Sequence, residues 1–153
     1  YAFVDADGAV SADELMRLLN CACSSKNLDM SFVAVRQFSG PLAVDRSLLR
    51  KATFHLFRTL VRGIVGLKWM DTQCGAKVIS GRSYRAVSER LVEDGFVFDV
   101  ELLATLQQGA WPITELPIMW QEIPGSKLRL WRDLWFMTGG LMRIRRRLNT
   151  SDL

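Results

Sequence analysis

The chain opens with a short run of strand-forming residues that leads directly into two aspartates and a glycine. Residues 1–4 have the aromatic and β-branched character of a buried strand, and Asp5, Asp7 and Gly8 follow them. Residues two apart on an extended backbone face the same side, so both carboxylates should lie together at the carboxyl edge of a sheet. Paired hard oxygen ligands suit Mg²⁺ or Mn²⁺ held between a protein and a diphosphate. We therefore expect Asp5 and Asp7 to bind a divalent metal ion.

A calcium-binding EF-hand loop is a competing interpretation of the same residues. If Gly8 stands at loop position 6, then Asp5, Asp7 and Glu14 fall at positions 3, 5 and 12 of the EF-hand pattern. Position 1 is a phenylalanine, and only two residues precede the loop where an EF-hand has its entering helix. Ser11 and Glu14 also fit a helix-capping box, which needs no metal. A non-enzymatic Ca²⁺-binding module nevertheless stays open as an alternative.

The composition predicts a folded globular chain. Hydrophobic residues make up 49% of the 153 residues, which is enough for a core of one domain or of one part of a domain. No signal peptide is visible, and the longest uncharged apolar stretch, Leu134 to Met142, is far shorter than the ~20 residues of a spanning helix. The three cysteines have no zinc-site spacing, so we expect reduced thiols.

The basic residues are concentrated near the C-terminus. The sequence holds 20 lysines and arginines against 16 aspartates and glutamates, a formal net charge of +4. Residues 127–147 contain one acidic residue, Asp133. The same stretch contains seven basic residues: Lys127, Arg129, Arg132, Arg143, Arg145, Arg146 and Arg147. No nucleic-acid recognition motif accompanies them, so we do not expect nucleic acid as a partner.

An amphipathic helix is predicted over residues 128–148, weakened at Gly139-Gly140. Its apolar side chains can share one surface bordered by arginines: Trp131, Leu134, Trp135, Met142 and Ile144. Such a surface suits a helix that lies in a membrane interface with its cations on anionic headgroups. The alternative is a terminal helix that packs on the domain and carries solvated arginines.

The remaining pattern alternates strands with helices. Strands are predicted over residues 1–4, 31–35, 76–79 and 113–120, the last with two prolines and so at a sheet edge. Helices are predicted over residues 12–21, 47–66, 82–91 and 100–108. This alternation predicts an α/β fold with a largely parallel sheet. A first strand that ends at the ligand-binding edge also leads us to expect earlier βα units upstream.

Four motifs in order resemble those of a known family. They are Asp5-Ala6-Asp7, Asp71 to Lys77, Phe98 to Leu103, and Glu115 to Trp120 followed by Gly125-Ser126-Lys127. The series resembles the dolichyl- and polyprenyl-phosphate sugar transferases among the family-2 inverting glycosyltransferases, and the second motif looks most like the members that transfer glucose. The resemblance implies a partial GT-A fold, a Rossmann-like α/β fold, whose N-terminal βα units are missing. Residues 1–126 would then belong to the catalytic domain and residues 127–153 would form the basic interfacial segment.

The resemblance also implies the reaction. A hexose, glucose or mannose, would pass with inversion from a UDP- or GDP-linked donor to a polyprenyl phosphate at the cytoplasmic face of a bacterial plasma membrane or the endoplasmic reticulum. A phosphate monoester has a second pKa near ~6, so the acceptor oxygen is already anionic at neutral pH and needs no strong base. The enzyme must instead neutralise charge and align the attack. Asp5 and Asp7 would hold the metal at the departing diphosphate.

Cationic side chains must then hold the acceptor phosphate. The resemblance implies Arg36 and Arg50 for this role. We also expect Ser126 and Lys127 to contribute, from a loop that can close over the diphosphate and bring in one cation. For both arginines the alternative is a solvated side chain on a loop or basic helix, and for Lys127 it is a surface turn.

Three further residues are candidate catalytic residues. Asp71 and Gln73 resemble loop residues near the sugar or the acceptor, although Asp71 also fits an Asx turn that holds its own backbone. Asp99 fits either a direct role or the N-cap of the helix that follows it. Glu101 would face the sugar hydroxyls or lie on a helix surface. If the acceptor were a polysaccharide or another lipid, a general base would be needed, and Asp71 or Asp99 would have to supply it.

Overall fold

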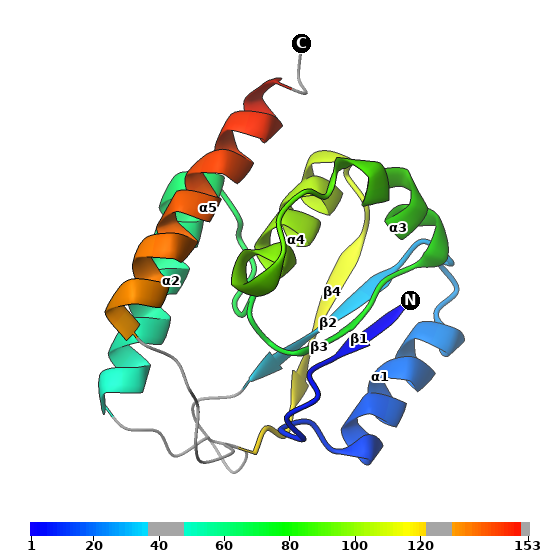
Figure 1. The fold of residues 1–153 in the computed structure, drawn as a ribbon. Helices are drawn as coiled ribbons and strands as arrows, with labels where there is room; N and C mark the ends of the chain where they lie inside the picture. The colour runs from blue at the N-terminus through cyan, green and yellow to red at the C-terminus, as the bar shows by residue number, and fades with distance from the viewer. Residues whose placement is uncertain (37–47, 122–129, 151–153) are drawn as a thin grey trace. The chain divides into compact units, whose positions relative to one another are not determined.

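A computed structural model describes residues 1–36, 48–121 and 130–150, which form two units (Figure 1). The sheet unit comprises Tyr1–Arg46, Cys74–Ala86 and Trp111–Gly125. The helical unit comprises Ser47–Gln73, Val87–Ala110 and Ser126–Leu153. Both units are assembled from segments far apart in the sequence, and the predicted division of the chain after residue 126 stays a prediction.

Four strands form the mixed sheet of the sheet unit. They are β1 (Ala2–Val4), β2 (Ser31–Arg36), β3 (Ala76–Val78) and β4 (Ile113–Ile118), in the order β1-β3-β2-β4. Strand β3 is antiparallel to both β1 and β2, and β2 is parallel to β4. The expectation of a largely parallel sheet is therefore wrong for the described strands. Strands β1, β2 and β4 still run in one direction, so their carboxyl ends meet at one edge of the sheet. This arrangement is a mixed α/β fold consistent with part of a GT-A-like fold.

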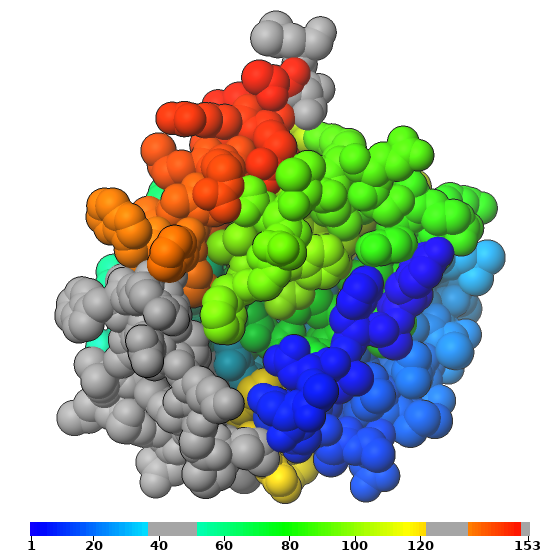
Figure 2. Space-filling model, in the orientation of Figure 1, coloured from blue at the N-terminus to red at the C-terminus, as the bar shows by residue number. Residues whose placement is uncertain are grey.

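The first strand lies at the surface. Tyr1 is 54% exposed and Val4 is 47% exposed, because β1 has a described neighbour on one side only. Figure 2 shows these first residues, in blue, lying over the surface of the molecule. The prediction of a buried strand is thus wrong for β1. The predicted edge position of β4 is confirmed, and its Pro117 lies opposite Val35 in the parallel pair.

Helix α1 (Ala12–Ser24) packs its apolar face on the sheet. The Ser11 hydroxyl oxygen accepts a hydrogen bond from the amide of Glu14 at 3.3 Å, which confirms the N-terminal half of the predicted capping box. Leu18 is 1% exposed and lies in one cluster with Phe32, Ala34, Cys74, Ala76 and Val78. All three cysteines are free thiols, as expected. Helix α3 (Gly81–Val87), which belongs to the sheet unit up to Ala86, is shorter than the helix predicted there and is followed by a 3₁₀ turn over Ser88–Arg90.

The helical unit contains α2 (Leu48–Val65), a 3₁₀ turn over Gly95–Val97, α4 (Phe98–Gln108) and α5 (Leu130–Thr150). Helix α4 is buried on nearly every side, through Val100 and residues 101–106. It begins at Phe98, so Asp99 lies inside its first turn, and the predicted N-cap role of Asp99 is wrong. Among the described helices, none is both long and apolar enough to cross a lipid bilayer.

Helix α5 continues without a break through the two glycines that were expected to weaken it. A Cβ atom on Gly140 would lie 2.8 Å from Cγ2 and 3.1 Å from Cγ1 of Val97, which is buried. A Cβ on Gly139 would meet only Arg143 Nη1, at 3.8 Å. Gly140 therefore allows α5 to approach the 95–97 turn closely, whereas Gly139 has no comparable packing role.

This difference between the glycines predicts opposite effects of alanine. Gly140→Ala should lower the free energy of unfolding by about 1–3 kcal/mol, because the branched Val97 side chain cannot swing away from the new methyl group. Gly139→Ala should raise it by about 0.5–1 kcal/mol, since alanine is the better helix former. Urea unfolding of both variants tests this. Equal effects of the two substitutions would contradict the packing role of Gly140.

Candidate functional site

The carboxyl-terminal edge of the sheet brings together three of the predicted site residues. Asp5 and Asp7 follow β1 directly, and Arg36 is the last residue of β2. Strand β3 runs the other way, so its amino end, with Gly75, comes to the same edge. The Asp5 amide donates a hydrogen bond to the Gly75 carbonyl at 2.8 Å. The predicted position of the two aspartates at this edge is therefore confirmed.

The aspartates lie on a tight loop between β1 and α1. Asp7 Oδ1 accepts a hydrogen bond from the Ala9 amide at 3.0 Å, and Gly8 between them has a φ of +76°. This left-handed conformation favours glycine. The Ala9 carbonyl in turn accepts from the Gln121 amide at 3.0 Å, which ties the loop to the segment after β4. A strand enters this loop where an EF-hand has a helix, so the EF-hand alternative is wrong.

Gly75 leaves the space that the Asp5 carboxylate occupies. A Cβ atom on Gly75 would lie 2.0 Å from Oδ2 of Asp5. Both aspartates are exposed on their outer side. The sequence places Gly75 within a motif, but no role was predicted for it. The feature that could have predicted this role is a glycine at the start of a predicted strand, which often marks the close approach of another group.

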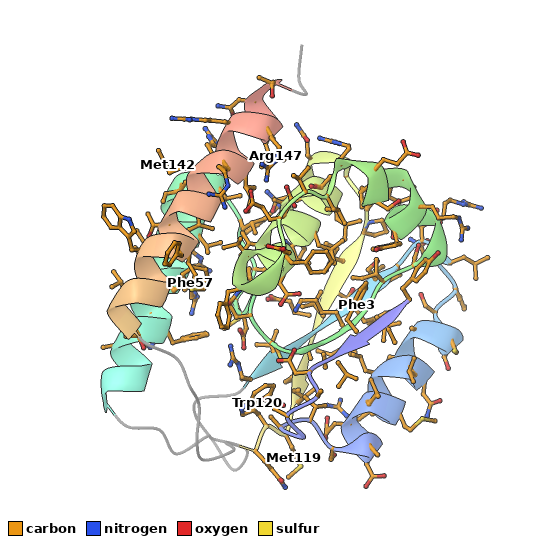
Figure 3. The ribbon with its side chains drawn as sticks, in the orientation of Figure 1. Phe3, Phe57, Met119, Trp120, Met142 and Arg147 are labelled. Atoms are coloured by element: carbon orange, nitrogen blue, oxygen red, sulfur yellow. The ribbon has the colours of Figure 1, made fainter. Side chains whose placement is uncertain are left out.

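Arg36 is held against an aromatic ring rather than solvated. The residue is 9% exposed, and its guanidinium carbon lies 4.9 Å from the ring centroid of Trp120, in the range of a cation–π interaction. Figure 3 labels Trp120, which follows β4. The alternative of a solvated Arg36 is wrong. The partnership with Trp120 was missed, because 84 residues separate the two in the sequence and only the parallel pairing of β2 with β4 joins them.

Two candidate catalytic residues lie on the loop of the helical unit that precedes β3. Asp71 is 1% exposed, and its Oδ1 accepts a hydrogen bond from the Gln73 amide at 3.3 Å, which is the predicted Asx turn. The Gln73 side-chain amide donates to the Phe96 carbonyl at 2.8 Å. Asp99 lies on the first turn of α4. The catalytic roles of these three residues stay predictions.

The other predicted phosphate ligands are less completely described. Arg50 lies near the start of α2, and its side chain is outside the described part of the chain. Ser126 and Lys127 also lie outside the described residues.

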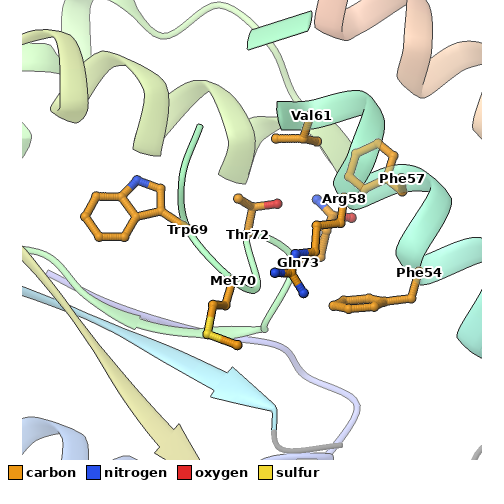
Figure 4. A pocket seen from close by; sticks show the side chains of 8 residues that line it. All are labelled: Phe54, Phe57, Arg58, Val61, Trp69, Met70, Thr72 and Gln73. Atoms are coloured by element: carbon orange, nitrogen blue, oxygen red, sulfur yellow. The ribbon is translucent and has the colours of Figure 1, made fainter. Parts of the chain in front are cut away.

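A small pocket in the helical unit has Gln73 as part of its wall (Figure 4). Its volume is about 10 Å³, the size of a single water site. The Trp69 Nε1 atom is buried without a hydrogen-bond partner among the described groups. Aromatic and apolar side chains dominate the lining: Phe54, Phe57, Arg58, Val61, Trp69, Met70, Thr72 and Gln73.

An ion-pair cluster of the helical unit holds α5 to α4. The Arg143 guanidinium donates to Glu93 at 2.6 and 2.9 Å, and Arg147 donates to Glu93 at 2.7 Å and to Glu101 at 2.6 Å. Glu101 is 2% exposed, and its other oxygen accepts from the backbone amides of Val92 and Glu93 at 2.8 and 2.7 Å. The expected surface position of Glu101 is therefore wrong, whereas its expected contact with the sugar stays a prediction.

Hydrogen bonds from the Arg143 guanidinium hold the pKa of the Glu93 carboxyl below its ordinary value, with Arg147 adding to the effect against the opposing influence of burial. The same pairing raises the pKa of Arg143. Because Glu93 binds protons less readily in the folded state, its contribution to stability is complete above the ordinary glutamate pKa. It is lost as the pH falls through the lowered folded pKa.

Acidification should therefore weaken this cluster. The free energy of unfolding should fall between about pH 5 and about pH 3, and Glu93→Gln should flatten that part of the curve. Urea unfolding at a series of pH values measures the effect. Glu89→Gln, at an exposed position of the same unit, is the matched control and should keep the wild-type slope. If Glu93→Gln kept that slope too, the cluster would not stabilise the fold.

Comparison with known proteins adds the family relationship. No protein-family model matches the chain, and no solved structure matches it significantly. The chain is 32% identical over 155 aligned residues to the dolichyl-phosphate beta-glucosyltransferase of Saccharomyces cerevisiae. This alignment covers 94% of this chain and 46% of that protein. The enzyme of the same name from Dictyostelium discoideum is 31% identical over 93% of this chain and 44% of its own length. The Homo sapiens enzyme of that name is 31% identical over 81% of this chain and 40% of its own length. The chain thus spans less than half the length of these relatives.

Proposed function

The chain belongs to the dolichyl-phosphate beta-glucosyltransferase family of glycosyltransferases, and we propose that the protein transfers glucose from a nucleotide-diphosphate sugar to dolichyl phosphate with inversion. The observation that carries the proposal is the match to named glucosyltransferases over 94% of the chain. The charged edge of the sheet supports it, because its residue types suit an anionic donor and an anionic acceptor. A mannosyl donor fits the same chemistry but lacks the support of the relatives' names.

In the proposed reaction, an oxygen of the acceptor phosphate attacks the anomeric carbon of glucose. The bond from that carbon to the diphosphate oxygen breaks, and the nucleoside diphosphate leaves with the electron pair. The acceptor oxygen is already ionised at neutral pH, since the second pKa of a phosphate monoester is about 6. The protein groups must therefore bring two anions together and align them, rather than remove a proton.

Asp5 and Asp7 are the proposed ligands of Mg²⁺ or Mn²⁺. The residues present fit such an ion: both are exposed hard-oxygen donors, the Ala9 amide orients the Asp7 carboxylate, and Gly75 leaves room for that of Asp5. The described residues hold no group of three or more His, Cys, Asp or Glu placed around one metal, so the diphosphate and water would complete the coordination. When bound, the ion would neutralise the negative charge that develops on the departing diphosphate.

Arg36 is the proposed ligand of the acceptor phosphate within the sheet unit. Its guanidinium lies at the same edge as Asp5 and is oriented by Trp120. An arginine held by stacking keeps donors for a phosphate and loses less conformational freedom when it binds. We propose Arg50, Ser126 and Lys127 as further phosphate ligands, and Asp71, Gln73 and Asp99 as residues near the sugar.

The metal role predicts the effect of two variants. Asp7→Asn should lower kcat/KM by about 100-fold or more, because an amide is a weaker ligand for a hard cation. Gly75→Ala should also lower it, since the new methyl group would displace the Asp5 carboxylate. Transfer of labelled glucose from UDP-glucose to dolichyl phosphate, measured across a Mn²⁺ titration, is the assay. Asp13→Asn, an exposed carboxylate on the first turn of α1, is the control and should keep full activity. Full turnover by Asp7→Asn would remove the metal role.

We further propose that α5 lies on the cytoplasmic face of a membrane. Trp135 and Phe136 are 80% and 68% exposed, and Met142 is 48% exposed one to two turns further on. Arg145 and Arg146 are exposed beyond them, which suits anionic headgroups. Ile144, predicted to share this surface, is 1% exposed and faces the protein interior instead, and the side chains of Trp131 and Leu134 lie outside the described residues.

Removing the two exposed rings should weaken membrane binding. The double variant Trp135→Ala/Phe136→Ala should reduce the partition coefficient onto vesicles with anionic lipid by about tenfold or more, because each ring buries apolar area in the interface. Co-sedimentation with vesicles of neutral and anionic composition measures it. Met16→Ala removes an apolar side chain that is 53% exposed on α1 and should have no effect. Unchanged sedimentation of the double variant would contradict this orientation of α5.

A further inference from the structure

A buried lysine stands in the middle of the sheet without a role in the function proposed so far. Lys77 is the central residue of β3 and is 1% exposed. Its neighbours across the sheet are Phe3 on β1 and Val33 on β2, which are apolar. Burial of an ammonium group is costly unless hydrogen bonds and opposite charges compensate for it. An apolar residue would fill this position of the sheet at a lower cost, so the lysine calls for an explanation other than packing.

The ammonium group of Lys77 reaches back along β3 toward the charged edge. Its Nζ donates a hydrogen bond to the Cys74 carbonyl at 2.5 Å. The next residue is Gly75, whose carbonyl accepts from the Asp5 amide at 2.8 Å. The Cα of Gly75 also faces the Asp5 carboxylate so closely that a side chain there would displace it. Lys77 thus holds the Cys74 carbonyl in place. The next residue, Gly75, contacts both the backbone and the carboxylate of Asp5.

We propose that Lys77 is a positioning residue of the donor site, which holds the Cys74–Gly75 turn and through it sets Asp5 for the metal ion and the diphosphate. Its Nζ lies at the peptide that precedes Gly75, so its positive charge is near the edge where Asp5 and Asp7 lie and where the proposed donor would add negative charge. An ammonium on a four-carbon stem suits this task, because it is a compact charge with three donors that can reach a backbone carbonyl from within the sheet. The inference rests on the proposed function, because it is the proposed nucleotide-sugar donor that supplies the diphosphate whose metal ion Asp5 would bind.

The test replaces Lys77 by a neutral side chain of similar length in the purified full-length protein. Lys77→Met should weaken the binding of Mn²⁺ in the presence of UDP-glucose by about 10- to 100-fold, as removal of groups that orient metal ligands does. Binding is measured from the electron paramagnetic resonance signal of free Mn²⁺. In the transfer assay the KM for UDP-glucose should rise by a similar factor, whereas the KM for dolichyl phosphate should stay within about twofold. Lys77→Arg, which keeps the charge, should recover part of the Mn²⁺ affinity.

Matched variants separate positioning from packing. Lys26→Met removes an exposed lysine of the same unit and should leave both measurements at wild-type values. If Lys77→Met does not fold, Lys77→Gln, whose side-chain amide keeps a donor, takes its place. Wild-type affinity for Mn²⁺ and UDP-glucose in a folded Lys77 variant would overturn the inference. So would an equal rise of both KM values together with a lowered thermal midpoint, which indicates general loss of packing.

The two proposals fail in different ways. A wild-type protein that binds Mn²⁺ with UDP-glucose but transfers no glucose to dolichyl phosphate would overturn the proposed acceptor and leave the role of Lys77 to the binding measurements. A wild-type protein with normal transfer and a Lys77→Met variant with unchanged donor affinity would overturn the role of Lys77 alone.

Discussion

The antiparallel insertion of β3 between β1 and β2 determines what meets at the charged edge of the sheet. Because β3 runs against its two neighbours, its amino end arrives where β1 and β2 finish. The hydrogen bond from the Asp5 amide to the Gly75 carbonyl closes this junction. A parallel β3 would bring its carboxyl end to the edge instead, and neither Gly75 nor the backbone carbonyl held by Lys77 would lie beside Asp5. The strand order thus places a glycine with no side chain against a carboxylate that needs space.

The helical unit has a comparable junction built from charges. Glu101 accepts from two consecutive backbone amides of the segment before the 95–97 turn and pairs with Arg147 of α5. The turn itself receives the side-chain amide of Gln73 through the Phe96 carbonyl. A continuous series of hydrogen bonds and short chain segments therefore joins α5 to the loop that carries Asp71 and Gln73. If α5 binds a membrane, the buried Glu101 carboxylate would contribute both to holding α5 on the helical unit and to ordering the loop with Asp71 and Gln73.

Local patterns in the sequence predicted the local features and missed the long-range ones. The strand before Asp5, the capping serine of α1 and the proline-bearing edge strand follow from residue types and short spacings, and the structure has all three. The direction of β3 did not follow, because a three-residue strand carries no signal for parallel or antiparallel pairing. The burial of Glu101 was missed for a related reason. Its partners are backbone amides eight and nine residues earlier and an arginine 46 residues later, and an acidic residue on a predicted helix indicates an exposed face by default.

Asp99 and Ile144 show a second kind of limit. An aspartate before a helical pattern predicts an N-cap, but α4 begins at Phe98, two residues before the predicted start, and the aspartate then falls inside the helix. Ile144 was assigned to an exposed surface because a helical pattern gives the angle between side chains but not which side meets the protein. Gly140 decides this point: its close approach to Val97 turns the side of α5 with Leu141 and Ile144 inward, and Trp135 and Phe136 are left exposed. Which aromatic residues of α5 are exposed is therefore determined by a glycine contact within the protein, not by the hydrophobic pattern alone.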